Sequence, residues 1–319
     1  MNTKTLIIVN PISGVGRQKR IEALLKQNLD QDLFDYEVRY TEYIHHGREI
    51  ARDAADRGYS CVVAVGGDGS VNDVVQGIKD TDVRLGIIPC GSGNGLARSL
   101  KIPLQPWLAI RVLNQRYEQT IDSIVISRND DPSRQFVCIN AAGVGFDAYI
   151  ARMMQAARTR GLAAYTNLVL REYERYKCSD YHLVINGKDY YRNAWFIAVA
   201  NSQQFGYNLA VAPQAKLDDG LIDISIIDKV PLEHMPITAP LAFTNHLNVS
   251  QHVEMFRTNE LLIEGNVDRW VNIDGEGENL GNSVRFVNHP KSVNIYSRDM
   301  KQLLIVRTPD GSPLTLPRQ

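Results

Sequence analysis

The residues with the clearest chemical potential are Gly66-Gly67-Asp68-Gly69-Ser70, which follow the apolar run 61–65 and precede a helical pattern at 71–78. A strand that ends in glycines lets backbone N–H groups approach a ligand closely, and a helix N-terminus just beyond favours negative charge. These properties suit a phosphate group. Because a carboxylate avoids direct contact with phosphate, we expect Asp68 to face a magnesium ion or a hydroxyl group that loses its proton. A tight turn without a ligand accounts for the same five residues equally well.

Two further glycine-rich segments follow strand-like runs. Asn10-Pro11-Ile12-Ser13-Gly14 and then Gly16-Arg17 come after the first run, and Gly91-Ser92-Gly93-Asn94 comes after the run 85–88. The Walker pattern is absent from the first segment, so a P-loop fold is disfavoured. Ligands of open α/β sheets bind beyond the carboxyl ends of the strands. We therefore expect the three loops to converge on one crevice that binds the phosphates of a nucleotide, with Arg17 supplying positive charge.

The elements that position these loops alternate between strand and helix through about residue 115. Apolar strand patterns at 5–10, 36–43, 61–65 and 85–88 are separated by helical patterns at 17–28, 47–57 and 71–78. Nearly continuous apolar strands between helices predict an α/β domain with a parallel sheet covered on both faces. The sequence thus predicts a nucleotide-binding domain over residues 1–122.

From about residue 117 the pattern changes to longer, alternating strands. Asn186-Gly187 between strand patterns at 181–185 and 188–200 predicts a hairpin, so the second domain, 123–301, is expected to be mainly antiparallel. A helical region at 148–177, broken near Gly161, and an apolar segment at 231–243 interrupt it. The tail 302–319 includes a strand pattern at 302–306 that can return to either domain.

The composition is that of a globular protein of two domains. The chain has 319 residues, 44% of them apolar and 22% charged, with a formal net charge of −1. This charge gives no general attraction to nucleic acid or to an anionic membrane, so we expect no nucleic acid partner and only local membrane contact. The four cysteines are far apart and suit buried, reduced thiols. No signal-peptide pattern or run long enough to span a bilayer occurs, which favours a cytoplasmic protein.

Taken in order, the motifs resemble the diacylglycerol kinase catalytic-domain family, which includes soluble bacterial lipid kinases and sphingosine kinases. Gly-Gly-Asp-Gly alone is not specific, since phosphofructokinases and NAD kinases also carry it, but the ordered set is. The matching segments are Asn10-Pro11-Ile12-Ser13-Gly14, Gly66 to Asp73, Gly91-Ser92-Gly93-Asn94, Gly143-Val144-Gly145-Phe146-Asp147, Ala212-Pro213, Asp218 to Asp223, and Asp274-Gly275-Glu276.

The resemblance implies an α/β nucleotide-binding domain followed by a β-sandwich lipid domain, with transfer of the γ-phosphate of ATP to a hydroxyl of diacylglycerol or a sphingoid base. It implies catalytic roles for Asp68 and Glu276, a role for Asp147 at the lipid head group, and Mg²⁺ as cofactor. Asp218 and Asp219 resemble a loop that binds structural magnesium, although a solvated Asp-Gly turn fits them as well. A peripheral membrane contact and a homodimer are further expectations. The ATP-binding positions that we expect are Asn10, Pro11, Ser13, Gly14, Arg17, Gly66, Gly67, Asp68, Gly69, Ser70, Gly91, Ser92, Gly93 and Asn94.

Two departures argue against diacylglycerol as the lipid. Gly95 stands where bacterial diacylglycerol kinases often have an acid, and Val15 stands where many members have lysine. An NAD kinase-like enzyme, and a catalytically silent nucleotide-dependent lipid-binding regulator, are the alternatives.

The helical region 148–177 predicts a membrane contact, because it carries an excess of four positive charges, Arg158 and Arg160 among them, beside Met153, Met154, Leu162 and Tyr165. A helix packed on the sheet with its arginines in water is the alternative for this region.

Overall fold

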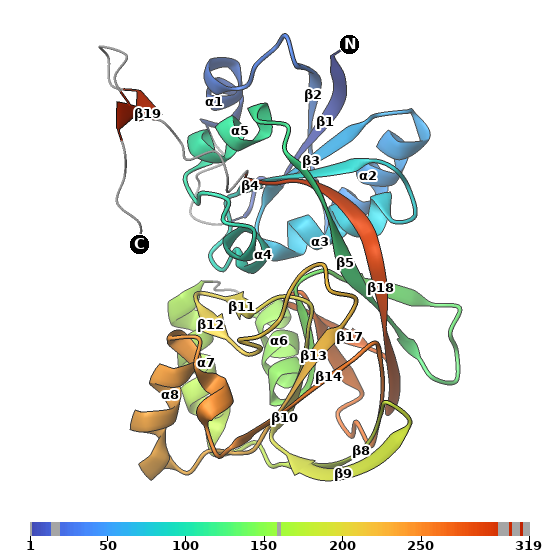
Figure 1. Ribbon diagram of the computed structural model, residues 1–319, viewed down its shortest axis with the longest axis vertical. Helices are drawn as coiled ribbons and strands as arrows, with labels where there is room; N and C mark the ends of the chain where they lie inside the picture. The colour runs from blue at the N-terminus through green and yellow to red at the C-terminus, as the bar shows by residue number, and fades with distance from the viewer. Residues whose placement is uncertain (1, 14–19, 158–160, 299–305, 308–312, 315–319) are drawn as a thin grey trace.

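The computed structural model describes residues 2–13, 20–157, 161–298, 306–307 and 313–314, without the side chains of Ala156, Leu162 and residues 306–307 and 313–314. The first domain contains four parallel strands in the order β2-β1-β3-β4. In β1, β3 and β4 the residues are mostly apolar and buried because helices cover both faces of the sheet, whereas the edge strand β2 buries only Phe34. Figure 1 shows α1 and α5 on one face and α2 and α3 on the other. The bounds are β1 Thr3–Val9, α1 Ile21–Asn28, β2 Phe34–Tyr40, α2 His46–Asp56, β3 Cys61–Gly66, α3 Asp68–Ile78, β4 Arg84–Pro89, α4 Gly95–Ser99 and α5 Pro106–Asn114.

The α/β alternation predicted for this domain is confirmed, with two differences at the glycine-rich loops. Helix α3 begins at Asp68, three residues earlier than the pattern indicates, so the glycine motif itself forms the first turn. Helices α4 and α5 were not expected. The helix pattern at 17–28 is described only from Ile21, since residues 14–19 lie outside the described residues.

The second domain is a sandwich of two sheets. One sheet has the strand order β14-β13-β10-β7-β16-β17, with every pair antiparallel, and the other contains β5, β6, β8, β9, β15 and β18. Apolar side chains from both sheets, such as Leu183, Ile224 and Phe286, form one buried core between them. The bounds are β5 Glu118–Arg128, β6 Gln135–Cys138, β7 Ala141–Gly145, β8 Ser179–Ile185, β9 Lys188–Ala194, β10 Phe196–Ala200, β11 Gln204–Gly206, β12 Leu209–Ala210, β13 Ile222–Ile227, β14 Val253–Thr258, β15 Glu260–Glu264, β16 Trp270–Ile273, β17 Glu276–Asn279 and β18 Ser283–Tyr296.

Helices cover the outer face of the six-stranded sheet. α6 (Phe146–Ala156), α7 (Leu162–Tyr173) and α8 (Met235–Phe243) contribute to an apolar cluster with Trp195 and Ile227 of that sheet region. The predicted break in the helical region is confirmed, because α6 and α7 are separate and Gly161 has a φ of +106°. Among the described residues, no helix is both long and apolar enough to span a bilayer.

The strand pattern at 188–200 is one strand in the prediction and two in the structure. β9 alternates between exposed and half-buried residues and belongs to the large sheet, whereas β10 is almost wholly buried and belongs to the six-stranded sheet. The chain changes sheets at Trp195. The hairpin before it is confirmed, since Asn186 and Gly187 both have positive φ, as a two-residue turn requires.

Strand β18 connects the two domains. It pairs antiparallel with β5 and β15, and near its end Ile295 pairs parallel with Leu85 of β4. In Figure 1 it runs beside β5 from the lower domain into the upper sheet. The tail strand expected at 302–306 lies outside the described residues apart from Val306, which belongs to the short strand β19 (Val306–Arg307) paired with β20 (Pro313–Leu314).

Candidate active site

The described part of the first loop, residues 10–13, meets the other two glycine-rich loops at the carboxyl ends of β1, β3 and β4, as expected. Asn10 Nδ2 donates to Ser70 Oγ over 3.1 Å, which ties the first loop to the start of α3. A Cβ atom on Gly91 would collide with the backbone of Gly67. Glycine is therefore needed at position 91 for the loops to pack together, whether or not a ligand is bound, and a Cβ atom on Gly67 would lie a tight 3.2 Å from Gly91 Cα.

Asn94 holds the third loop closed. It has a left-handed backbone with φ 53°, its Nδ2 donates to Gly91 O over 2.8 Å, and its Oδ1 accepts from Gly91 N over 3.0 Å. The side chain is buried. Among the predicted ATP-binding residues, Asn94 therefore shapes the third loop. Gly66 lies against Ser70, and its lack of a side chain makes room for the first turn of α3.

A cavity of about 930 Å³ lies above these loops, and we call it the first cavity. Gly14 and Arg17 lie outside the described residues. Ile12 and Ile44 also line the cavity and are largely exposed, so they offer an apolar surface beside the polar loops. The predicted ATP-binding residues that line this cavity are Asn10, Pro11, Ser13, Gly67, Gly69, Ser70, Gly91 and Ser92.

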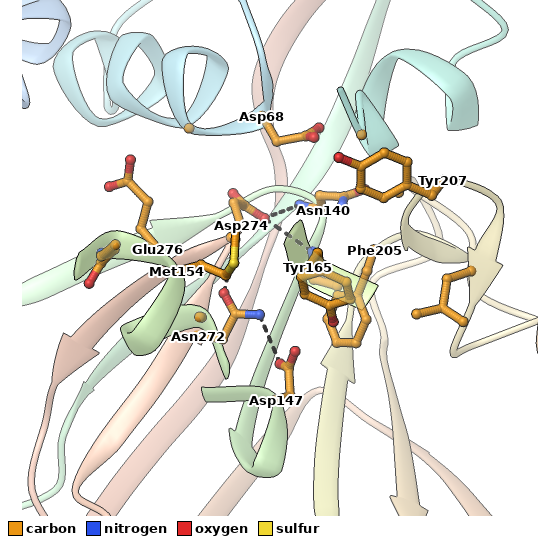
Figure 2. A pocket seen from close by; sticks show the side chains of 18 of the residues that line it. Asp68, Asn140, Asp147, Met154, Tyr165, Phe205, Tyr207, Asn272, Asp274 and Glu276 are labelled. Carbon is orange, nitrogen blue, oxygen red and sulfur yellow. Dashed lines mark hydrogen bonds between the residues drawn. The ribbon is translucent and has the colours of Figure 1, made fainter. Parts of the chain in front are cut away.

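A second cavity, of about 340 Å³, lies between the glycine-rich loops and the sandwich domain (Figure 2). Met154, Tyr165, Phe205 and Leu209 give it apolar walls. Asp147 lies at its sandwich-domain end and Asp68 at its nucleotide-domain end. An apolar space with carboxylates at its two ends is suited to an amphiphilic molecule.

Asp147 is buried in the first turn of α6. Its Oδ2 accepts from Asn272 Nδ2 over 2.8 Å, and a Cβ atom on Gly143 would lie 2.5 Å from the same oxygen, which explains the glycine. Burial raises the pKa of Asp147 to about 6, and the Asn272 hydrogen bond opposes the rise. Near neutral pH the group is therefore mostly an unpaired buried carboxylate that favours a cationic or hydrogen-bond-donating ligand.

Glu276 lines both cavities, as does Gly69. It is the first residue of β17 after the two-residue turn Asp274-Gly275, where both residues have positive φ. A Cβ atom on Gly69 would lie 2.6 Å from Glu276 Oε1, so glycine lets the carboxylate approach the first turn of α3. Burial and the Asp73 carboxylate raise the pKa of Glu276 to about 7, and His45 opposes the rise.

Asp68 faces the second cavity and the start of α4. Removal from water and the neighbouring Asp274 carboxylate raise its pKa to about 6, whereas hydrogen bonds from the backbone N–H groups of Gly95, Asn94 and Leu96 oppose the rise. A carboxylate that already accepts backbone hydrogen bonds is held in a fixed orientation, with further lone pairs for a metal ion or a hydroxyl.

Asp274 is a site residue that sequence reasoning missed. Its buried carboxylate accepts hydrogen bonds from Asn72 Nδ2 at 2.7 Å, from Cys138 Sγ at 3.1 Å and from the N–H groups of residues 139–141 at 2.9 to 3.1 Å. It thereby connects the turn before Glu276 to α3 and to the corner between β6 and β7. The only sequence signal was its place in the Asp-Gly-Glu motif, because its partners are far away in the sequence.

Comparison with known proteins agrees with this geometry. Residues 4–126 match the family described as Diacylglycerol kinase catalytic domain, and residues 140–297 match the one described as YegS C-terminal NAD kinase beta sandwich-like domain. The chain belongs to the diacylglycerol kinase catalytic-domain family. The resemblance seen in the ordered motifs is thus confirmed.

Several members of the diacylglycerol kinase family resemble the chain over most of its length. It is 33% identical over 196 residues to "Probable lipid kinase YegS-like" of Chromohalobacter salexigens, covering 60% of this chain but only 61% of that protein. It is 26% identical over 275 residues to the diacylglycerol kinase of Bacillus subtilis, covering 85% and 88% of the two chains. The crystal structure of a diacylglycerol kinase from Bacillus anthracis has the same fold, with a TM-score of 0.68 at 18% identity over 94% of this chain and 98% of the other.

The acidic loop that resembles a magnesium loop of this family has other partners here. Asp219 forms an ion pair with Arg257, whose Nε also lies 3.1 Å from Asp223 Oδ1. Leu221 N donates to Asp219 Oδ1 over 3.2 Å, which is an Asp-Gly turn of the ordinary kind. Asp218 lines a separate cavity at the domain junction. A magnesium ion on Asp218 and Asp219 stays a prediction.

The helical region chosen for membrane contact is packed more tightly than expected. Met154 and Tyr165 line the second cavity, Arg152 lies over the Trp270 ring, and Arg171 pairs with Glu172. Arg158 and Arg160 lie outside the described residues. The contact predicted for this region therefore has less support than the alternative, a helix pair that packs its apolar side chains inward.

Proposed function

We propose that this protein is an ATP-dependent lipid kinase that transfers the γ-phosphate to a hydroxyl group of a membrane lipid. One observation carries the proposal: Gly69 and Glu276 line both the first cavity, above the glycine-rich loops, and the second, apolar-walled cavity. A phosphate held by the loops and a lipid hydroxyl in the second cavity would therefore meet at the same carboxylate.

The first cavity has the properties of a nucleotide site. The first turn of α3 lies in the glycine motif, so its unpaired N–H groups face the loops and favour phosphate. The Asp68 carboxylate, at the nucleotide-domain end of the second cavity, fits Mg²⁺, which prefers carboxylate ligands. When bound, Mg²⁺ neutralises negative charge on the transferring phosphoryl group.

The protein's own groups divide the remaining work. Glu276 accepts the proton of the attacking hydroxyl, since a carboxylate with a pKa of about 7 is well matched to proton transfer near neutral pH. Asp147 binds the polar head of the lipid, and Asn272 positions it. Asn272 also accepts from Gly275 N over 2.9 Å, which links the head-group end of the second cavity to the turn before Glu276.

The chemistry of Asp147 favours a lipid with an amine or hydroxyl beside the reacting hydroxyl. Asn272 Nδ2 is the one hydrogen-bond donor seen on this buried carboxylate among the described residues. A charge-assisted bond to an ammonium group is stronger than a neutral one. We therefore rank an amine-bearing sphingoid base above a neutral glycerolipid, in line with Gly95 standing in place of the acid.

The helices of the sandwich domain near the second cavity offer a membrane contact. α8 and the short helices on either side of it, Leu232–His234 and Leu247–Val249, expose several large apolar side chains: Leu232, Ile237, Phe243 and Val249. α8 packs against β12, which contributes Leu209 to the second cavity. We propose that this apolar end, in place of the arginine-rich helical region, rests on the membrane from which the lipid is taken.

The deciding experiment is transfer of labelled γ-phosphate to diacylglycerol, monoacylglycerol, sphingosine and dihydrosphingosine in mixed micelles. We expect transfer to at least one of them, with a loss in kcat of about 10² to 10⁴ in Asp68→Asn, the range for a positioned charge or proton acceptor. Circular dichroism checks that the variant is folded. Phosphorylation of NAD in place of any lipid would support the NAD kinase alternative, and ATP binding without transfer would support a silent regulator.

A further inference from the structure

A histidine and two carboxylates gather at the edge of the first cavity. His45 precedes α2, Asp73 lies on α3, and Glu276 begins β17 in the other domain, so three elements supply one side chain each. Their candidate ligand atoms all lie within 4.8 Å of one another. These residues are far apart in the chain, so the cluster has no local signature in the sequence.

The geometry around His45 suits a metal ligand better than a hydrogen-bond donor. The same nitrogen, Nδ1, lies 3.1 Å from Asp73 Oδ1 and 3.7 Å from Glu276 Oε2. One N–H group can donate well to only one of them. Neighbouring ligands of an ion with bonds of about 2.1 Å are about 3.0 Å apart in an octahedron and about 3.4 Å apart in a tetrahedron, so all three atoms can share one ion after small shifts.

His182 gives an internal contrast. It also lies between two carboxylates, but its Nε2 contacts Asp189 Oδ1 at 2.6 Å and its Nδ1 contacts Glu264 Oε2 at 2.9 Å. With opposite ring nitrogens in use, that histidine bridges two acids and cannot chelate with them. At His45 both acids lie on one side of the ring.

In the described part of the chain, the positively charged side chains near the cluster leave its carboxylate oxygens without close partners from outside it. Arg48 Nη2 lies 3.8 Å from Asp73 Oδ1, which is beyond hydrogen-bond distance. Among the described residues, no hydrogen bond to the Glu276 carboxylate is seen, and its contact with His45 Nδ1 is 3.7 Å long. His45 itself holds a left-handed backbone, with φ 64°, a conformation that disfavours most side chains.

We propose that His45, Asp73 and Glu276 bind a divalent transition-metal ion such as Mn²⁺ or Zn²⁺. A mixed set of imidazole and carboxylates suits these ions better than Mg²⁺, which prefers oxygen ligands alone. Three protein ligands leave the remaining coordination positions open toward the first cavity. A nucleotide phosphate in the first cavity would occupy these positions, and this part alone rests on the proposed function.

The site is separate from that of Asp68, whose carboxylate faces the second cavity and α4. An ion on Glu276 Oε2 leaves Oε1 against Gly69, where the two cavities meet. The ion would thus fix the orientation of Glu276 by holding its second oxygen.

The test uses the full chain, stripped of metal and free of nucleotide and lipid. Mn²⁺ is titrated, and free ion is measured by electron paramagnetic resonance. We expect at least about tenfold weaker binding at one site in His45→Asn and in Asp73→Asn. Asparagine tolerates the left-handed backbone of residue 45 better than most residues do, so the fold is retained. His46→Asn and His182→Asn are the matched controls, and Mn²⁺ binding should be unchanged in both.

Electron spin-echo spectroscopy of the wild-type protein with bound Mn²⁺ provides a second measurement that needs no variant. We expect a directly coordinated histidine nitrogen whose signal is lost in His45→Asn and kept in His182→Asn. Wild-type Mn²⁺ binding without nitrogen coupling, or equal affinity in His45→Asn, would overturn the proposal and leave His45 as an ion-pair partner of Asp73. Neither measurement involves phosphoryl transfer, so failure of the lipid kinase assay would leave this result unaffected.

Discussion

In the proposed function Glu276 is the proton acceptor, and its pKa of about 7 makes a pH dependence measurable. The carboxylate is the active form, so in protein without an ion on His45, Asp73 and Glu276, kcat/KM should rise as the pH increases through about 7 and then level off. Glu276→Gln should lower kcat by at least about 10² and abolish this rise. The measurement is the pH profile of phosphate transfer for both proteins.

If Glu276→Gln kept the same rise near pH 7, another group would be the acceptor. Asp68, with a pKa of about 6, would then be the candidate, and its profile should rise at a lower pH. ATP affinity should change little in Glu276→Gln under the proposed assignment.

The Asp147 carboxylate should lower the free energy of unfolding and, in return, bind the lipid head group. Its pKa is raised from 3.8 to about 6 in the folded protein, so the folded state binds more protons than the unfolded state between these values. Stability therefore falls as the pH rises from about 4 to 6, and the full penalty is present at pH 7. Asp147→Asn should raise the free energy of unfolding at pH 7.5 by up to about 3 kcal/mol, with little gain below pH 4.

Urea denaturation at pH 7.5 and at pH 4 measures this effect. The same variant should raise the KM for sphingosine more than the KM for a neutral glycerolipid. A less stable variant at pH 7.5 would show that the Asp147 carboxylate is satisfied by the fold and not kept for a ligand.

At the scale of elements, two hairpins allow a matched comparison. Gly275 and Gly187 each follow a residue of positive φ in a two-residue turn, have φ of +96° and +72°, and have no atom within 4 Å of an added Cβ. Alanine at either position should cost about 1 kcal/mol of stability through backbone strain alone. Only Gly275→Ala should also lower kcat, because β17 begins with Glu276.

Thermal denaturation and steady-state kinetics of the two variants test this. Equal kcat values in Gly275→Ala and Gly187→Ala would mean that the Asp274-Gly275 turn does not position the carboxylate.

These elements also show which features the sequence could predict. Continuous apolar runs such as 61–65 identified the parallel strands, and Asn186-Gly187 identified its hairpin, because both depend on neighbouring residues. The start of α3 at Asp68 was missed, since glycine-rich residues carry no helical periodicity. Convergence of the loops could be predicted because each loop follows the carboxyl end of a strand in a parallel sheet.

The contacts that complete the site could not be predicted in the same way. Asp274 and Asn72 are 202 residues apart in the chain, and His45 meets Glu276 across the two domains. The split between β9 and β10 was missed because Trp195 continues an apolar pattern while the chain passes to another sheet. Such features depend on packing of the whole fold and have no local signature.

At the scale of the whole molecule, the apolar end around α8 should determine membrane binding. Ile237→Glu combined with Phe243→Glu replaces two side chains that are 72% and 58% exposed. Loss of their insertion into the interface should weaken sedimentation with anionic vesicles several-fold. Turnover of a short-chain, water-soluble lipid should be unchanged.

Val267→Glu is the control, since Val267 is 69% exposed on the loop between β15 and β16, away from α8 in the chain. Vesicle binding that is unchanged in the double variant, or equally reduced in Val267→Glu, would exclude α8 as the membrane contact.

The path of β18 has a consequence for biosynthesis. The edge of β4 receives its neighbour only when residues near 295 are in place, because Ile295 of β18 pairs with Leu85 of β4. A ribosome must therefore release the whole second domain before the first domain has its full sheet, although N-terminal domains commonly fold first during synthesis. Until then the open edge of β4 is a template for wrong pairing with other chains. Expression of residues 1–122 alone should accordingly give aggregated material, and chaperones would find their binding site along this edge.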